Sequence, residues 1–296
     1  MPELPEVETI RRGLAPLVEG RTLEELTILD PRWCEPLAPS EVVDAVQGRR
    51  VEALRRRGKY LVWALEGDVF LLMHLRMTGT LLYDAKLDER FRRVTFALSD
   101  GHELAFCDQR RFGTGELALG PEALDAFFAA RLGVEPLDAD VPLTGAALRA
   151  LTRGRRAPIK AFLLDQRRIA GVGNIYADEA LFRAKIHPLR PAGKLTARQC
   201  DALADAVTEA LTAGLAAGGA TIDDFRHPDG VYGGFQHEFL VHLRRGEPCH
   251  TCGTEIVKFV AAGRGTYACE SCQPRPRGAR RASAPAPAAV KRPAAA

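Results

Sequence analysis

The chain has 296 residues, 46% of them apolar, which leaves room for two domains with hydrophobic cores and a smaller module. No apolar run reaches the roughly 20 residues that span a bilayer, and the acidic N-terminus is unlike a signal peptide. We therefore expect a cytoplasmic protein without membrane contact, and a monomer, because no dimer interface is indicated. The net charge is +3, but residues 273–296 hold six basic residues and no acid, and the remainder has 35 basic and 38 acidic residues. Any nucleic-acid surface must therefore come from local basic clusters.

The first predicted elements are one helix and a series of short strands. Apolar residues recur every three or four positions over residues 5–18, which predicts an amphipathic helix. From about residue 22 to 119, apolar runs predict strands at 26–29, 60–65, 69–73 and 94–98. Ser99-Asp100-Gly101 has the composition of a hairpin turn. Several short strands with frequent turns favour a sandwich or a barrel.

The chain becomes helical after about residue 132. Ala- and Leu-rich segments between 142 and 215 predict helices, and a capping box is expected at Thr196–Gln199. Residues 218–236 are rich in glycine and turn residues, which predicts a mobile loop. The Pro-, Ala- and Arg-rich tail is expected to be disordered. The predicted fold class is therefore α+β with several domains: a strand-rich domain 1–131, a helical domain 132–237, a cysteine module 238–273 and the tail 274–296.

Four of the seven cysteines predict a metal site. Cys249-x-x-Cys252 is followed, after sixteen residues, by Cys269-x-x-Cys272, and two such pairs can present four thiolates to one ion. This pattern favours a tetrahedral structural Zn²⁺. Such a closed site has no open position for catalysis, so Arg264, at the tip of the predicted hairpin between the pairs, becomes the functional candidate. The scattered cysteines (Cys34, Cys107, Cys200) indicate buried apolar positions in a reducing compartment.

The N-terminus predicts an amine nucleophile. Pro2 follows the initiator methionine, and the carboxylates Glu3 and Glu6 lie within one helical turn of it. If Met1 is removed, Pro2 presents a secondary amine with an ordinary α-amino pKa near 8, which the start of a helix lowers further. Such an amine can condense with an aldehyde carbon to form an iminium. The plainer alternative is a proline and two acids placed where helices ordinarily carry them.

A glycine-rich turn predicts a phosphate site in the helical domain. Lys160 and two arginine clusters, 153–156 and 167–168, precede Gly171-Val172-Gly173-Asn174. The helix that starts near Asn174 has free N–H groups, which suit a phosphate. The alternative is an ordinary turn between two helices.

Together these features form a recognisable pattern. The chain resembles bacterial formamidopyrimidine-DNA glycosylase, the 8-oxoguanine repair enzyme, over residues 1–273. The resemblance rests on motifs that occur in one order: the Pro-Glu-Leu-Pro-Glu-Val-Glu start, Arg57–Tyr60, His74–Gly79, Asp108–Gly113, Gly171–Glu179, Gly218–Ile222 and the cysteine module with Gly263–Thr266. It implies an N-terminal helix with a β-sandwich, a helix-two-turns-helix domain and a zinc-finger hairpin.

The resemblance implies a bifunctional DNA glycosylase/AP lyase of base excision repair. Pro2 matches the nucleophile that attacks C1′ of the damaged nucleoside, and Glu3 matches the acid that assists base loss and ring opening. Glu6 matches a supporting acid. Lys59 matches a lysine assigned to β-elimination, and Arg264 a zinc-finger arginine assigned to δ-elimination.

The resemblance also implies the partner, double-stranded DNA with oxidised purines or abasic sites, and therefore association with the nucleoid. Met77, Arg110 and Phe112 resemble the trio that fills the gap left by a flipped base. The loop 218–236 resembles a lesion-recognition loop. Backbone-phosphate contacts are implied for Arg155, Lys160 and Asn174.

Three departures from the family pattern concern DNA contacts. Gln109 replaces a usual proline, Phe91 replaces a frequent histidine, and His242-Leu243 replaces a usual Tyr-Gly. Three alternatives stay open: an endonuclease VIII-like glycosylase for oxidised pyrimidines, a damage-binding paralogue with weakened catalysis, and a non-enzymatic DNA-binding protein. Leu4 and the Arg110–Phe112 run argue against the first, and the intact Pro2 argues against the last.

Overall fold

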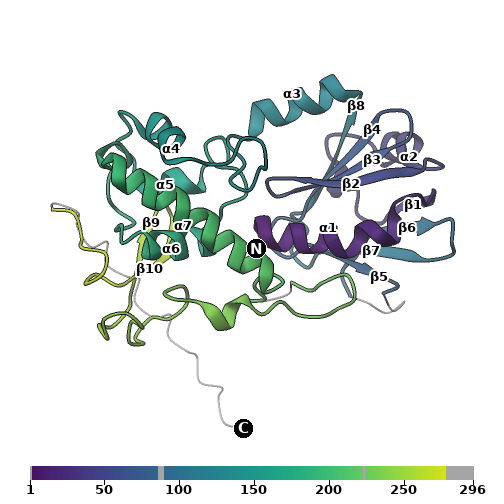
Figure 1. Cartoon of the computed structure of the whole chain (residues 1–296). Coiled ribbons are helices and arrows are strands. Elements are labelled where there is room, and N and C mark those ends of the chain that lie inside the picture. The colour runs from purple at the N-terminus through teal and green to yellow at the C-terminus, as the bar shows by residue number, and fades with distance from the viewer. Residues whose placement is uncertain (1, 86–89, 223–224, 278–296) are drawn as a thin grey trace, which may run out of the picture.

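The computed structural model describes residues 2–85, 90–222 and 225–277. Its described part comprises a β-sandwich with an N-terminal helix, a helical domain and a C-terminal β-hairpin, which confirms the predicted fold class (Figure 1). The α-helices are α1 Leu4–Val18, α2 Pro39–Val46, α3 Pro121–Arg131, α4 Gly145–Thr152, α5 Ile159–Leu164, α6 Asn174–Arg183 and α7 Ala197–Ala216. Short 3₁₀ turns lie at η1 Pro31–Cys34, η2 Ala192–Lys194 and η3 Phe235–Glu238. The sequence predicts disorder for the tail 274–296, and residues 278–296 of this tail lie outside the described ranges.

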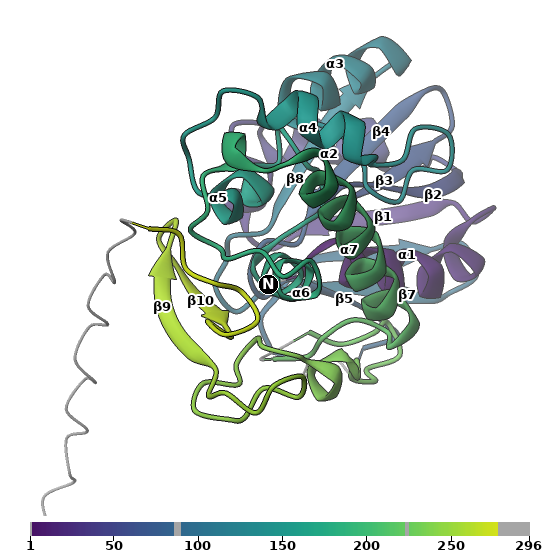
Figure 2. The same ribbon diagram turned by 60° about the vertical axis from the view of Figure 1, so that its left-hand side comes forward.

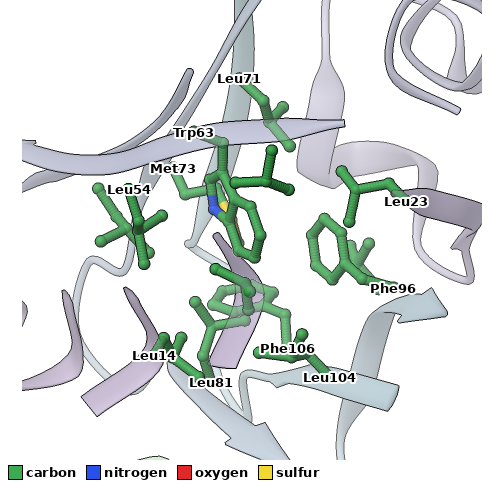
Figure 3. Packing of buried hydrophobic residues seen from close by; sticks show 14 of the residues in the cluster. Leu14, Leu23, Leu54, Trp63, Leu71, Met73, Leu81, Phe96, Leu104 and Phe106 are labelled. Carbon is green, nitrogen blue, oxygen red and sulfur yellow. The ribbon is translucent and has the colours of Figure 1, made fainter. Parts of the chain in front are cut away.

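Two four-stranded antiparallel sheets form the sandwich. One has the order β1-β6-β7-β5 and the other β2-β3-β4-β8. The strands are β1 Leu23–Ile28, β2 Val51–Arg57, β3 Tyr60–Leu65, β4 Val69–His74, β5 Thr80–Tyr83, β6 Arg92–Leu98, β7 Glu103–Cys107 and β8 Thr114–Leu119. Trp63 from one sheet stacks on Phe96 from the other, with ring centroids 5.3 Å apart, at the centre of the core (Figure 3). The four predicted strands are confirmed, and the predicted Ser99–Gly101 turn joins β6 to β7.

Helix α1 connects the sandwich with the helical domain. Val7, Ile10 and Leu14 lie in the sandwich core, whereas Leu4, at the first turn, lies in the core of the helical domain. The start of α1 lies beside α6 (Figure 2). The N-terminal residues are therefore held where the two domains meet.

The helical domain packs α4, α6 and α7 around one core. The predicted capping box is confirmed, because the Thr196 hydroxyl accepts from the Gln199 N–H and the Gln199 side chain accepts from the Thr196 N–H. None of the helices in the described part of the chain is both long and apolar enough to cross a bilayer.

A two-stranded hairpin, β9 Val257–Ala261 and β10 Arg264–Ala268, completes the described chain. It confirms the predicted hairpin, and Arg264 stands directly after its turn. Strand β10 packs against α6, whose beginning lies beside the start of α1 (Figure 2).

Candidate active site

The site begins at the N-terminal end of α1. Pro2 and Glu3 are both buried. The Glu3 backbone N–H donates to Glu6 Oε2 at 2.8 Å, so one carboxylate of the first turn satisfies a free donor of the helix start. These contacts hold Pro2, directly before Glu3, in one place.

The Glu3 carboxylate caps a second helix, α6. It accepts from the Gly173 N–H at 2.7 Å and from the Ile175 N–H at 2.9 Å. Glu3, 170 residues away, therefore occupies two of the N–H groups where the sequence predicted a phosphate site. A Cβ on Gly173 would lie 2.3 Å from Glu3 Cδ, so only glycine permits this approach. The glycine-rich turn thus positions a candidate catalytic acid.

Glu6 joins three segments. Its Oε1 accepts from the Tyr176 hydroxyl at 2.7 Å and from the Ala220 N–H at 2.8 Å. Burial, with the nearby Glu3 carboxylate as a second cause, raises the pKa of Glu6. Glu6 therefore fixes α1 against α6 and against the beginning of the loop 218–236.

A pocket of about 340 Å³ opens above Glu3. Of the residues predicted from the sequence, Glu3, Lys59, Met77, Asn174 and Arg264 line it. They come from the N-terminus, the β2–β3 turn, the segment after β4, α6 and β10. A larger cavity of about 730 Å³ beside α4 and α7 contains none of them, so the smaller pocket is the candidate active site.

Two cations, Lys59 and Arg264, line this pocket. Lys59 is only 5% exposed, and burial lowers the pKa of its amine, with the Arg264 guanidinium as a further lowering cause. The carboxylates of Glu3 and Glu6 partly oppose this effect, because their negative charge raises the pKa of Lys59. A lowered pKa increases the share of neutral amine, which suits a group that takes up and returns a proton. Arg264 is exposed at the hairpin tip and is free to reach a ligand.

Two histidines of the pocket were not among the predicted site residues. His74 is buried, and burial lowers its pKa to about 3, so its ring is neutral and accepts the Arg76 N–H at 3.0 Å. His242 lies behind the hairpin and contacts Asp178. His74 could have been found, since it begins the motif His74–Gly79, whereas His242 counted only as a departure from the family pattern.

The predicted gap-filling trio lies on two linked loops. Asp108 is fully buried and accepts from the backbone N–H groups of Arg110 and Phe112, at 3.1 and 2.9 Å. It also accepts the Thr78 hydroxyl, which ties this loop to the neighbouring Met77. Phe112 is 51% exposed, and the Arg110 guanidinium lies 4.9 Å from its ring centroid. An exposed aromatic beside an arginine indicates a contact surface rather than a core position.

Of the three predicted phosphate ligands, only Arg155 is exposed. Lys160 is fully buried, and its amine donates to Asp178 Oδ1 at 2.6 Å and to Thr266 Oγ1 at 2.9 Å. The amine therefore points to the buried Asp178 carboxylate, and the phosphate contact of Lys160 stays a prediction. Asn174 donates to the Gly265 carbonyl at 3.0 Å and lines the pocket, so its phosphate contact stays a prediction.

The four predicted metal ligands lie together. The sulfur atoms of Cys249, Cys252, Cys269 and Cys272 all lie within 4.8 Å of one another. A tetrahedral Zn²⁺ with Zn–S bonds of about 2.3 Å requires sulfur atoms about 3.8 Å apart. The Cys249–Cys272 separation is 3.9 Å, so this set fits one structural zinc ion, which would hold the base of the hairpin.

Three family descriptions match the chain in sequence. The formamidopyrimidine-DNA glycosylase N-terminal domain matches residues 1–115, and the H2TH domain of the same enzyme matches residues 132–226. The zinc finger found in FPG and IleRS matches residues 246–275.

Whole proteins match over nearly their full length. The chain is 45% identical to the formamidopyrimidine-DNA glycosylase of Chloroflexus aurantiacus, covering 92% of this chain and 98% of that protein. Among solved structures, MutM (Fpg) of Thermus thermophilus is 42% identical with a TM-score of 0.82, covering 92% of this chain and 98% of that one. A Lactococcus lactis Fpg mutant in complex with Fapy-dG-containing DNA is 34% identical with a TM-score of 0.86, covering 93% of this chain and all of that one. This chain belongs to the formamidopyrimidine-DNA glycosylase family.

Proposed function

We propose that this protein is a bifunctional DNA glycosylase/AP lyase that excises oxidised purines from double-stranded DNA through a Schiff base on Pro2. The supporting observation is the convergence of Glu3, Lys59 and Arg264 on one pocket beside Pro2, from segments far apart in the sequence. The Lactococcus lactis relative has been solved with DNA that contains Fapy-dG or an abasic site. We propose the domain boundaries 1–131, 132–237 and 238–273, followed by the tail 274–296.

The reaction begins at the sugar of a flipped nucleotide. After removal of Met1, the Pro2 nitrogen attacks C1′, the bond from C1′ to the base breaks, and the base leaves with its electron pair and a proton. Glu3 protonates the ring oxygen O4′, the ring opens, and a cationic iminium joins C1′ to Pro2. Loss of the C2′ proton then expels the 3′ phosphate. A second elimination expels the 5′ phosphate, with Lys59 and Arg264 as the groups nearest to these steps.

Extrusion of the nucleotide leaves a gap in the duplex, and unstacking costs a few kcal/mol. Met77 and Phe112 would fill this gap with apolar surface, while Arg110 would bond the unpaired base on the opposite strand. Arg155 and Asn174 would contact backbone phosphates, which set the register of the duplex. The loop 218–236, fixed at its start by Glu6, would enclose the lesion.

Borohydride trapping tests this proposal directly. A duplex with one 8-oxoguanine opposite cytosine is incubated with the protein and reductant, and the adduct is mapped by peptide sequencing. The expected result is a covalent adduct on Pro2 that is absent from the Pro2→Gly variant within the same time. Binding without an adduct would instead indicate a damage-binding paralogue, and an adduct only with thymine glycol would indicate an endonuclease VIII-like specificity.

A further inference from the structure

The described part of the loop 218–236 enters the cores of both domains. Ala220 and Phe235 are buried in the core of the helical domain, whereas Phe225 is buried in the core of the sandwich. Phe225 is only 6% exposed, and it belongs to the same cluster as the apolar face of α1. Figure 1 shows the chain passing below α1 towards β5 after it leaves α7. Phe225 therefore holds the loop on the sandwich, because its withdrawal would leave a cavity in that core.

Hydrogen bonds to strand β5 hold the same part of the loop. β5 is an edge strand, since its sheet has the order β1-β6-β7-β5. The Tyr83 N–H donates to the Pro228 carbonyl at 2.8 Å, and the Thr80 hydroxyl donates to the Arg226 carbonyl at 2.9 Å. Thr80 is only 2% exposed, so its bond is shielded from water. The loop therefore covers the free edge of β5 directly after Phe225.

The docked part of the loop is linked to a wall of the candidate active site. The Thr221 hydroxyl donates to the Phe225 carbonyl at 2.9 Å and accepts from the Gly233 N–H at 2.9 Å. Ile222, the next residue, lines the pocket and is 38% exposed. The position of Ile222 therefore depends on the anchoring of Phe225, whose own side chain lies in the sandwich core.

A pocket wall of this kind matters most to a substrate that still carries a base. A flipped base loses its stacking in the duplex and regains contacts only from the pocket that receives it. An abasic sugar has no base to hold, and its cleavage needs only the amine and the groups around it.

We propose that Phe225 and Thr80 are positioning residues for base excision, because they dock the loop on the sandwich and thereby set the pocket wall at Ile222. This inference rests on the proposed function, which supplies the flipped nucleotide. Loss of either anchor slows the excision of an oxidised purine and leaves the cleavage of an existing abasic site unchanged.

Single-turnover assays on two substrates test this proposal. One duplex carries 8-oxoguanine opposite cytosine, and the other carries a preformed abasic site at the same position. In Phe225→Ala, base excision should slow by up to about 100-fold, as a misplaced contact can cause, while abasic sites are cleaved at the wild-type rate. Phe225→Leu keeps an apolar side chain in the core and should recover most of the excision rate.

Thr80 allows a second test that changes only one hydrogen bond. Thr80→Val keeps the shape of the side chain and removes the donor to the Arg226 carbonyl. Excision should slow about five-fold, which corresponds to one hydrogen bond, and Thr80→Ser should restore it because the hydroxyl returns.

Leu98→Ala is the matched control for Phe225→Ala. Leu98, on β6, is 1% exposed in the same core but does not belong to the loop, so the folded variant should process both substrates as the wild type does. Melting curves show whether each variant is folded. Excision at the wild-type rate in folded Phe225→Ala, or an equal loss on both substrates, overturns the inference. A wild type that leaves 8-oxoguanine in place contradicts the proposed function itself, which separates the two failures.

Discussion

At the scale of single residues, the main feature of the site is a buried lysine, Lys59. Lys59 is 5% exposed, and burial lowers the pKa of its amine. An amine that is harder to protonate in the folded state than in the unfolded state costs stability wherever the unfolded chain holds the proton. Burial of Lys59 therefore suits proton transfer but lowers the stability of the folded state.

We predict that Lys59→Met raises thermal stability while greatly lowering strand cleavage. Removal of about 1 kcal/mol of desolvation cost would raise Tm by about 2–4 °C. The sign follows from the lowered pKa: the cost is full below the folded-state pKa and disappears above the ordinary lysine value near 10.4. The gain in Tm should therefore shrink as the pH is raised, which calorimetry over a pH series measures. A Tm below that of the wild type at neutral pH would contradict this account.

At the scale of elements, the beginnings of α1 and α6 form one unit. The Glu3 carboxylate caps α6, and Gly173 leaves just enough space for it. This arrangement could not be predicted from the sequence. Gly171-Val172-Gly173 correctly indicated a close approach, but a local pattern cannot tell whether a ligand or a side chain 170 residues away makes it. The helix 5–18 and the strand 60–65, by contrast, followed from local apolar periodicity alone.

We predict that Gly173→Ala displaces Glu3. The added Cβ would lie 2.3 Å from Glu3 Cδ, so the carboxylate must leave the α6 cap. Overpacking of this kind costs about 1–3 kcal/mol, and the misplaced acid should slow base excision by about 100-fold. Single-turnover excision and urea unfolding measure the two effects; excision at the wild-type rate in the folded variant would refute the capping role.

The cysteine module is an element whose structure was predictable because its ligands are spaced locally in two pairs. We predict that Cys269→Ser releases zinc and weakens DNA binding. Zinc binding contributes about 10–16 kcal/mol in small zinc-finger peptides, and loss of one thiolate removes a large part of it. Without zinc, the hairpin that presents Arg264 would lose its base. Metal content by atomic emission and binding to abasic-analogue DNA check both effects, with Cys34→Ser as the control outside the module. Unchanged DNA affinity after zinc loss would show that the finger is dispensable.

At the scale of the whole molecule, α6 holds the domains together through its acidic side chains. Asp178 pairs with Lys160, and Glu179 accepts the backbone N–H groups of Leu240, Val241 and His242. Arg56 and Arg57, in turn, bind Glu135 and tie the sandwich to the helical domain. The resemblance implied a DNA contact for Lys160. In this structure the charges of Lys160, Arg56 and Arg57 are paired internally with acids that lie elsewhere in the chain, which no local pattern reveals.

We predict that Lys160, although buried, affects DNA binding through its pairing with Asp178. In Lys160→Ala, the Asp178 carboxylate keeps only His242, and breaking such a buried pair costs about 3 kcal/mol or more. The amine also donates to Thr266 on β10, so its loss should loosen the hairpin against α6. Hydrogen exchange should increase at residues 264–268, and DNA affinity should fall because Arg264 is less well placed. The exposed Lys194 gives the matched control Lys194→Ala, which removes the same charge from the surface. If Lys160 bound phosphate directly, its removal would lower affinity and the salt slope while leaving hairpin exchange unchanged, which is the opposite pattern.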